Sequence, residues 1–276
     1  MALKLMYITN SAEIAKIAEN SGIDRIFVDL EYIGKDLRQG GMDTVQNHHT
    51  VFDVEKIKNS IKKAELVVRI NPIHDETDDY NSTEAEIDEV IKAGADIIML
   101  PYFKTANEVK RFVSAVNGRA KVILLFETAD AVQNADEILS INGIDEAYIG
   151  LNDLSLCYGH KFMFKPLIDG TVEGLIEKFK VKNIPYGFGG IASLGKGDLP
   201  SDNIIPEHIR LGSTCVILSR SFCNADKIDD LEEIRPIFEI GIKNIRNFES
   251  LCFSKNSKFF TANREKVVEI INQICD

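Results

Sequence analysis

Three charged residues, Arg69, Glu127 and Asp153, lie at the ends of short apolar runs, and their types suit metal binding and charge stabilisation. If the runs are parallel strands of a barrel, their carboxyl ends meet at one rim, where the three side chains would converge. Glu127 and Asp153 could then share a hard cation such as Mg2+ or Mn2+, because such cations take oxygen ligands and keep several waters. Each carboxylate alone could equally be a helix N-cap or a solvated loop residue, but the pair beside Arg69 favours a metal site.

The runs that carry these residues alternate with amphipathic helical patterns along nearly the whole chain. Most runs are almost continuously apolar, as expected of parallel strands buried on both faces. Strands are predicted at 3–9, 25–31, 66–71, 96–101, 121–128, 146–153, 185–190 and 214–222. Helices are predicted between them at 11–20, 53–64, 82–93, 105–116, 129–139 and 166–182. This repeating order predicts an α/β protein with a TIM (β/α)8 barrel, in preference to a doubly wound sheet.

The barrel is expected to form a single domain over 1–276, with 228–276 as a C-terminal helical extension. Helices are predicted in that extension at 228–247 and 265–274. Two connections are long: 32–52 carries His48 and His49, and 191–212 is rich in glycine and proline. Long connections after barrel strands lie at the carboxyl-terminal face, where active sites are built.

Composition and charge narrow the class of protein. Hydrophobic residues make up 45% and charged residues 27% of the chain, which is ordinary for a globular protein. The net charge of −11 argues against a nucleic-acid partner. The five cysteines show no metal-finger spacing, and neither a signal peptide nor a membrane-spanning run is evident, so we expect reduced thiols, a cytoplasmic location and no membrane partner.

Four motifs, in order, resemble the successive motifs of the HpcH/HpaI aldolase and citrate lyase β-subunit superfamily. They are ValArgIleAsnPro (68–72), GlyAlaAspIleIleMetLeuPro (94–101), LeuPheGluThrAlaAspAlaVal (125–132) and IleGlyLeuAsnAspLeuSer (149–155). The order and spacing agree from about residue 22 to residue 155, which is roughly half of the chain. The resemblance implies a barrel that binds pyruvate or phosphoenolpyruvate and an enzyme that makes or breaks a carbon–carbon bond next to a 2-oxo acid.

The resemblance also implies a role for each matching residue. Glu127 and Asp153 would be the metal ligands, and Arg69 would hold the 2-oxo oxygen of the substrate. The backbone around Asn152 and Asp153 would receive the substrate carboxylate. The metal would act as a Lewis acid, and Arg69 would add fixed positive charge at the same oxygen. Members of the family are commonly oligomers, so a homo-oligomer is expected.

One position departs from the family pattern. Aldolases of this family carry a histidine directly after the acidic segment Asp29-Leu30-Glu31, and here that position is Tyr32. Tyrosine is a poor base at neutral pH, because its ordinary pKa is near 10. His48 or His49 is therefore predicted to do the acid/base work, although both could be solvated loop residues.

The departure at Tyr32 leaves the type of reaction open. The first hypothesis is a metal-dependent aldolase that cleaves a 4-hydroxy-2-oxo acid, or condenses pyruvate with an aldehyde. A CoA-ester lyase of the citrate lyase β type is an alternative, because such members also lack the histidine. A barrel that binds an oxo acid without turnover is a third, but the intact set of Arg69, Glu127 and Asp153 disfavours it.

A glycine cluster at Gly187–Gly190 and the arginines Arg210 and Arg220 admit two interpretations. Loops after strands seven and eight of barrels often bind phosphate, and either arginine could pair with it. The glycines could instead only permit tight turns, and this second interpretation is slightly favoured.

Overall fold

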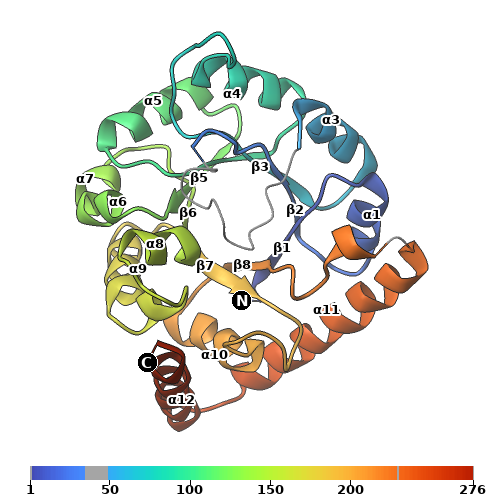
Figure 1. The fold of residues 1–276 in the computed structure, drawn as a ribbon, viewed down its shortest axis with the longest axis vertical. Helices are drawn as coiled ribbons and strands as arrows, with labels where there is room; N and C mark the ends of the chain where they lie inside the picture. Colours follow the sequence, from blue (N-terminus) through green and yellow to red (C-terminus); the bar gives the residue numbers. More distant parts are fainter. Residues whose placement is uncertain (1, 35–48, 229, 276) are drawn as a thin grey trace.

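The computed structural model describes residues 2–34, 49–228 and 230–275. Within these residues, parallel strands pair in chain order and close into a barrel, with helices around its outside (Figure 1). The strands are β1 (Lys4–Ile8), β2 (Arg25–Asp29), β3 (Glu65–Arg69), β4 (Ile97–Leu100), β5 (Lys121–Phe126), β6 (Glu146–Ile149), β7 (Tyr186–Ile191) and β8 (Cys215–Leu218). The predicted (β/α)8 barrel is confirmed.

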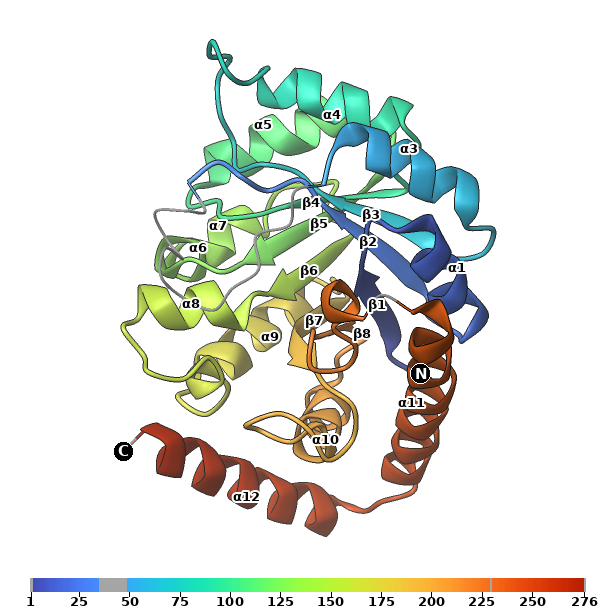
Figure 2. The same ribbon diagram turned by 45° about the vertical axis from the view of Figure 1, so that its right-hand side comes forward.

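Helices surround the barrel (Figure 1). They are α1 (Ala12–Asn20), α3 (Val51–Ser60), α4 (Thr83–Lys92), α5 (Ala106–Val116), α6 (Ala129–Gln133), α7 (Ala135–Ile138), α8 (Leu151–Cys157), α9 (Thr171–Val181), α10 (Ser201–Leu211), α11 (Leu231–Phe253) and α12 (Ser257–Cys275), with short 3-10 turns η1 (Lys165–Leu167) and η2 (Ala225–Lys227). Because α11 packs on both α1 and α10, it closes the ring, and α12 packs on α10 outside it (Figure 2). The predicted extension therefore divides into one ring helix and one outer helix. Among the helices of the described residues, none is both long and apolar enough to cross a membrane.

Two expectations about local structure are wrong. The loop predicted at 191–212 contains α10 in its second half, although Pro206 lies inside that helix. Proline removes one helical hydrogen bond, but the burial of Ile204 and Ile205 against the barrel offsets this loss. The strand predicted to reach Asp153 ends at Ile149, and Asp153 lies in the first turn of α8.

The interior of the barrel sets which side chains reach the carboxyl-terminal rim. Side chains alternate along a strand, and the interior cluster contains Phe27 of β2, Val67 of β3 and Leu125 of β5. Two residues further along each of these chain segments, the same inward face carries Asp29, Arg69 and Glu127. The strand pattern alone therefore directs these three polar side chains toward one another.

A repeated Gly-Xxx-Asp segment secures the opposite, amino-terminal rim. The aspartates Asp24, Asp96 and Asp145 precede β2, β4 and β6, and their carboxylates accept the amides of Leu5, Leu66 and Val122, each at 2.8 Å. The glycines Gly22, Gly94 and Gly143 each adopt a positive φ two residues earlier, a backbone conformation that other residues rarely take. Each segment thereby ties the start of one strand to the loop that leads into the next strand.

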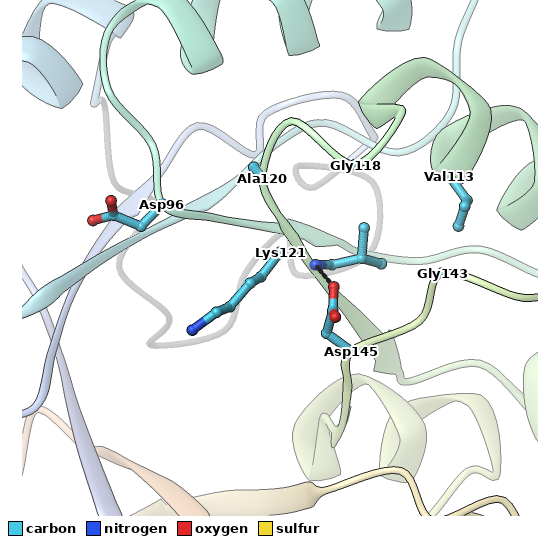
Figure 3. Close-up of a pocket in the computed structure, with 8 residues that line it drawn as sticks. Asp96, Val113, Gly118, Ala120, Lys121, Gly143 and Asp145 are labelled. Carbon is cyan, nitrogen blue, oxygen red and sulfur yellow. Dashed lines mark hydrogen bonds between the residues drawn. The ribbon is translucent and has the colours of Figure 1, made fainter.

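A cavity of about 430 Å3 lies at this amino-terminal rim (Figure 3). Its walls include Asp96, Lys121 and Asp145, and the Asp145 carboxylate already accepts the amide of Val122. Lys121 in turn forms an ion pair with Glu65 at 2.5 Å. Since barrel active sites lie at the carboxyl-terminal face, this cavity belongs to the stabilising end of the molecule.

Candidate active site

Arg69 is held at the carboxyl-terminal rim by two carboxylates, one at the end of the neighbouring strand and one just after it. The register pairs Asp29 of β2 with Arg69 of β3. Arg69 Nε and Nη2 each donate to one oxygen of Asp29 at 2.8 Å, and Nη1 lies 3.3 Å from Glu31 Oε2. Burial alone would lower the pKa of the Arg69 guanidinium, but the charges of Asp29 and Glu31 outweigh it and hold that pKa well above its ordinary value. Arg69 is therefore a fixed positive charge in one orientation.

Glu127 lies in a narrow slot between the ends of β4 and β6. The residue is 2% exposed, and the backbone amide of Tyr102 donates to its Oε1 at 3.0 Å. On the other side is Gly150, where an added Cβ would lie 2.7 Å from Glu127 Oε2 and 2.9 Å from Glu127 Cβ. Only a glycine at position 150 therefore leaves room for the Glu127 carboxylate where it stands.

The backbone of Tyr102 has the left-handed conformation that non-glycine residues rarely adopt, with φ of 48°. This conformation directs the Tyr102 amide at Glu127. The following residue, Phe103, accepts the Thr128 hydroxyl through its carbonyl at 2.8 Å. The turn after β4 is thus bonded to residues 127 and 128 by two hydrogen bonds, and local strain of this kind is often found at functional sites.

Asp153 lies in the first turn of α8, the helix that begins after Gly150, and is 7% exposed. The helix contacts residue 127 at two points, because Gly150 packs on the Glu127 side chain and the Cys157 thiol lies 3.8 Å from the Glu127 carbonyl oxygen. Asp153 is placed between these two contacts along the helix. Glu127 and Asp153 are therefore brought to the same part of the rim, although Asp153 comes from a helix and not from a strand end.

The donor set at this rim fits a hard divalent cation better than a soft one. Glu127 and Asp153 supply carboxylate oxygens, which are the ligands that Mg2+ and Mn2+ prefer. Among the described residues there is no group of three or more His, Cys, Asp or Glu side chains that could enclose a metal. Two carboxylates suffice for a cation that keeps several waters or takes ligands from a substrate.

His49 and Tyr32 lie next to the ion pair of Asp29 and Arg69. His48 falls outside the described residues. The backbone amide of Asp29 donates to His49 Nδ1 at 3.0 Å, so a neutral His49 carries its proton on Nε2. The Tyr32 hydroxyl donates to the His49 carbonyl oxygen. Burial, and after it the charge of Asp29, raise the pKa of Tyr32 above its ordinary value. At neutral pH Tyr32 therefore has even less of its deprotonated, basic form than an exposed tyrosine.

The residues around β7 and β8 support the turn interpretation more than a phosphate site. A Cβ at Gly187 would lie 2.4 Å from the Cys215 carbonyl oxygen, so this glycine permits close packing of β7 on β8. Arg210 lies near the end of α10 that leads into the amino terminus of β8, and it pairs with Glu173 and Glu207 at 2.7 Å. Arg210 is therefore at the amino-terminal end of the barrel, away from the rim where a phosphate site is expected. Arg220 follows β8 at the carboxyl-terminal rim.

Sequence reasoning missed three contributors to the site: the pairing of Asp29 with Arg69, the Tyr102 amide and the slot at Gly150. Two-residue alternation from Phe27 was a usable signal for Asp29, because it puts both side chains on one face. Gly150 lay inside a quoted motif, but its importance depends on a neighbour 23 positions away in the chain. The conformation of Tyr102 had no signal, since tyrosine does not favour a left-handed backbone.

A parallel barrel with an arginine and two carboxylates at its carboxyl-terminal rim has the architecture of an enzyme that stabilises negative charge on a bound substrate. A sequence profile of the HpcH/HpaI aldolase/citrate lyase family matches residues 4–163, which is more than half of the chain. The chain belongs to this family, and the predicted family is confirmed.

Individual relatives are distant. A hydroxypyruvate/pyruvate aldolase of Sagittula stellata is 25% identical over 138 residues, which cover 39% of this chain and 53% of that protein. A 2-keto-3-deoxy-L-rhamnonate aldolase of Escherichia coli O157:H7 is 22% identical over 215 residues, which cover 67% of this chain and 73% of that protein. The chain thus spans about half the length of the first relative and about three quarters of the second.

Two solved structures share the fold of this chain. The HpcH/HpaI aldolase of Desulfitobacterium hafniense superposes with a TM-score of 0.60 at 16% identity, over 88% of this chain and 93% of that one. The citrate synthase SbnG superposes with a TM-score of 0.61 at 15% identity, over 89% of this chain and 94% of that one. At these identities the likeness extends to the fold alone.

Proposed function

We propose that this protein is a divalent-metal-dependent carbon–carbon lyase that forms or cleaves the bond next to a pyruvate-like 2-oxo acid. The observation that carries the proposal is the slot in which Glu127 is held between the Tyr102 amide and Gly150, the residue that begins the helix of Asp153. A divalent metal is general among class II aldolases of the HpcH/HpaI family, and we propose Mg2+ or Mn2+ on the carboxylates of Glu127 and Asp153.

The chain's own residues would stabilise the charge that develops during the reaction. A bound cation would act as a Lewis acid toward the 2-oxo group. Arg69, held by Asp29 and Glu31, would present a permanent positive charge to the same oxygen without reorganising. Hydrogen bonds to Asp29 engage two of the five guanidinium N–H groups, and others would donate to the substrate. The backbone at Asn152 and Asp153 is proposed to receive the substrate carboxylate.

Proton transfer is proposed to fall to His48 or His49. For His49 the geometry sets a condition, because its Nδ1 already accepts the Asp29 amide and its Nε2 carries the proton. In this tautomer the ring donates a hydrogen bond, and it can accept a proton only if the bond to Asp29 is released. A pH–rate profile with a limb near pH 6.5 that is lost in His48→Ala or His49→Ala would support the assignment. Full activity in both variants together with an inactive Tyr32→Phe would transfer the role to Tyr32.

One observation favours a second candidate, a CoA-ester lyase. Tyr32 occupies the position of the family histidine, and its hydroxyl is engaged with the His49 carbonyl. The test is a screen for pyruvate or acetyl-CoA release from 4-hydroxy-2-oxo acids and from acyl-CoA esters, with and without Mg2+ or Mn2+. Metal-dependent pyruvate release from the hydroxy acids supports the first candidate. Release only from the CoA esters would replace it with the second.

We further propose that the enzyme is a cytoplasmic homo-oligomer. Exposed apolar side chains on α11 support a subunit contact, since Ile240 is 59%, Leu251 50% and Phe253 48% exposed. Light scattering of the purified protein tests this, and a single monomer mass at micromolar concentration would contradict it.

A further inference from the structure

A bulge interrupts the pairing of β7 with β8 toward the end of β7. The register pairs Gly187 with Cys215 and Gly190 with Ile217, so three steps along β7 match two steps along β8. One extra residue in a strand disrupts the hydrogen-bond ladder locally and bends that strand. Bulges are common next to active sites, where they re-aim side chains or end the pairing of strands.

The hydroxyl of Tyr148, from β6, is inserted into the ladder at this bulge. The Ile217 amide donates to Tyr148 Oη at 2.9 Å, and the hydroxyl donates to the Gly189 carbonyl oxygen at 2.6 Å. One hydroxyl thereby joins the backbones of β8 and β7 where the two strands are out of step. Because a buried backbone group that lacks a partner is costly, the bulge depends on this hydroxyl.

Two glycines of β7 accommodate the ring that carries the hydroxyl and the bend of the strand. Tyr148 is 1% exposed, and a Cβ at Gly187 would lie 2.6 Å from Tyr148 Cε2. Gly189 has a positive φ of 54°, which glycine adopts most readily. Burial raises the pKa of Tyr148 well above its ordinary value, and its proton is engaged with Gly189. Tyr148 therefore acts through the backbone and not by proton transfer.

The bulge contacts the start of α8. A Cβ at Gly189 would lie 2.8 Å from Leu151 Cδ1 and 3.4 Å from Leu151 Cγ, so the Leu151 side chain packs directly on the Gly189 backbone. Leu151 is the first residue of α8 and is 1% exposed. The preceding residue, Gly150, packs against Glu127, which follows β5. The first turn of α8, which carries Asp153, is thus fixed between residue 127 and the bulge in β7.

We propose that Tyr148 is a positioning residue for the metal and carboxylate site, because its hydroxyl holds the bulge at Gly189 and the bulge sets the position of the first turn of α8. Asn152 and Asp153 lie in that turn, and they are the residues proposed to receive the substrate carboxylate and the metal. The inference rests on the proposed lyase function, since it concerns how the same site is held in place.

Tyr148→Phe removes the bridging hydroxyl and keeps the ring. The Ile217 amide and the Gly189 carbonyl then lose their shared partner, so the bulge must rearrange and the start of α8 must follow it. We expect Mn2+ affinity, measured by calorimetry, to fall by about tenfold or more, as for loss of other groups that orient metal ligands.

Tyr186→Phe is the matched control for this change. Tyr186 is also buried, and its hydroxyl also donates to a backbone carbonyl oxygen at 2.6 Å, that of Leu211 at the end of α10. This bond lies away from α8, toward the segment that leads into the amino terminus of β8. Tyr186→Phe should therefore lose stability in urea unfolding but retain wild-type Mn2+ affinity.

A second pair of variants tests the contact with α8 without removing a hydroxyl. Gly189→Ala places a methyl group against Leu151 and should also lower Mn2+ affinity by about tenfold or more. Gly118→Ala is its control, because Gly118 also has a positive φ, of 68°, but a Cβ there has no described atom within 4 Å. Gly118 lies at the amino-terminal rim, so this variant should keep wild-type affinity.

Four outcomes decide the proposal. Wild-type Mn2+ affinity in a folded Tyr148→Phe overturns the positioning role and leaves the lyase proposal standing. If that variant does not fold, wild-type affinity in Gly189→Ala overturns it in the same way. An equal loss of affinity in either control also overturns it, because the loss then follows general destabilisation. If wild-type protein neither binds Mn2+ nor exchanges the pyruvate methyl protons with deuterated water, the proposed function fails and this inference fails with it.

Discussion

Replacing Gly150 by alanine adds one methyl group against the carboxylate that is proposed to bind the metal. The new carbon would lie 2.7 Å from Glu127 Oε2, 2.9 Å from Glu127 Cβ and 3.2 Å from Leu125 Cδ1. Ordinary contact begins near 3.4 Å, so the carboxylate oxygen must move by about 0.7 Å or α8 must shift. Because Glu127 is buried and its Oε1 is bonded to the Tyr102 amide, the side chain has little room to rearrange.

The expected effect on metal binding follows from the size of that movement. A metal–oxygen bond to Mg2+ is about 2.0–2.1 Å long with strict geometry, so a shift of about 0.7 Å removes much of the bond. We expect Mn2+ affinity to fall by about 10- to 100-fold, as for loss of a group that orients a ligand. Overpacking should also lower the free energy of unfolding by about 1–3 kcal/mol.

Calorimetry with Mn2+ and urea unfolding measure the two effects separately. Gly174→Ala in α9 is the matched control, because a Cβ there meets nothing within 4 Å. That change should leave Mn2+ affinity unchanged and raise stability by roughly 0.5–1 kcal/mol, as expected for alanine in a helix. Wild-type Mn2+ affinity in Gly150→Ala would refute the argument that this slot positions Glu127.

Three further predictions concern other parts of the molecule. Arg69→Lys keeps the charge but loses the two-pronged contact with Asp29, so kcat/KM should fall by about 100-fold or more, and near-normal turnover would show a structural role only. Asp145→Ala leaves the Val122 amide without its acceptor at the amino-terminal rim and should cost about 1–3 kcal/mol in urea unfolding, while a changed Mn2+ affinity would contradict the separation of the two rims. Burial lowers the pKa of His208 to about 3, so the unfolded chain, with a pKa near 6.5, takes up the proton first and stability is lost as the pH falls from about 6.5 toward 3. His208→Gln should therefore remove about 2 kcal/mol of the wild-type stability loss between pH 7 and pH 5, and equal losses in both proteins would contradict the burial of a neutral ring.

The barrel was predictable because its strands are buried on both faces. Continuous apolar runs mark such strands, and their order implies the rim on which Arg69 and Glu127 lie. The position of Asp153 in a helix was harder to predict, since the run Ile149-Gly150-Leu151 continues the apolar pattern although the strand has ended. Here the helix begins without a side-chain cap at Gly150, so the usual signal for a helix start is missing.

The helix α10 and the slot around Glu127 show what local patterns leave out. Glycine and proline near α10 favour a loop locally, but burial of Ile204, Ile205 and Leu211 stabilises the helix. The slot depends on an amide from the turn after β4 and on the glycine that follows β6, which meet only when the barrel closes. The Gly-Xxx-Asp repeat at the other rim, by contrast, is visible in the sequence at regular positions before strands, and it is a usable signal for strand starts.

The most direct test of a metal-assisted 2-oxo acid site at this rim is deuterium exchange of the pyruvate methyl group in deuterated water, followed by proton NMR with Mg2+. Wild-type protein, Glu127→Gln and Asp153→Asn are compared at equal concentration, with circular dichroism to confirm folding. We predict exchange in the wild type that stops when the metal is chelated, and a loss of about 100-fold or more in each variant. Wild-type exchange rates in both folded variants would contradict the account, as would a wild-type protein that exchanges no protons with any divalent cation.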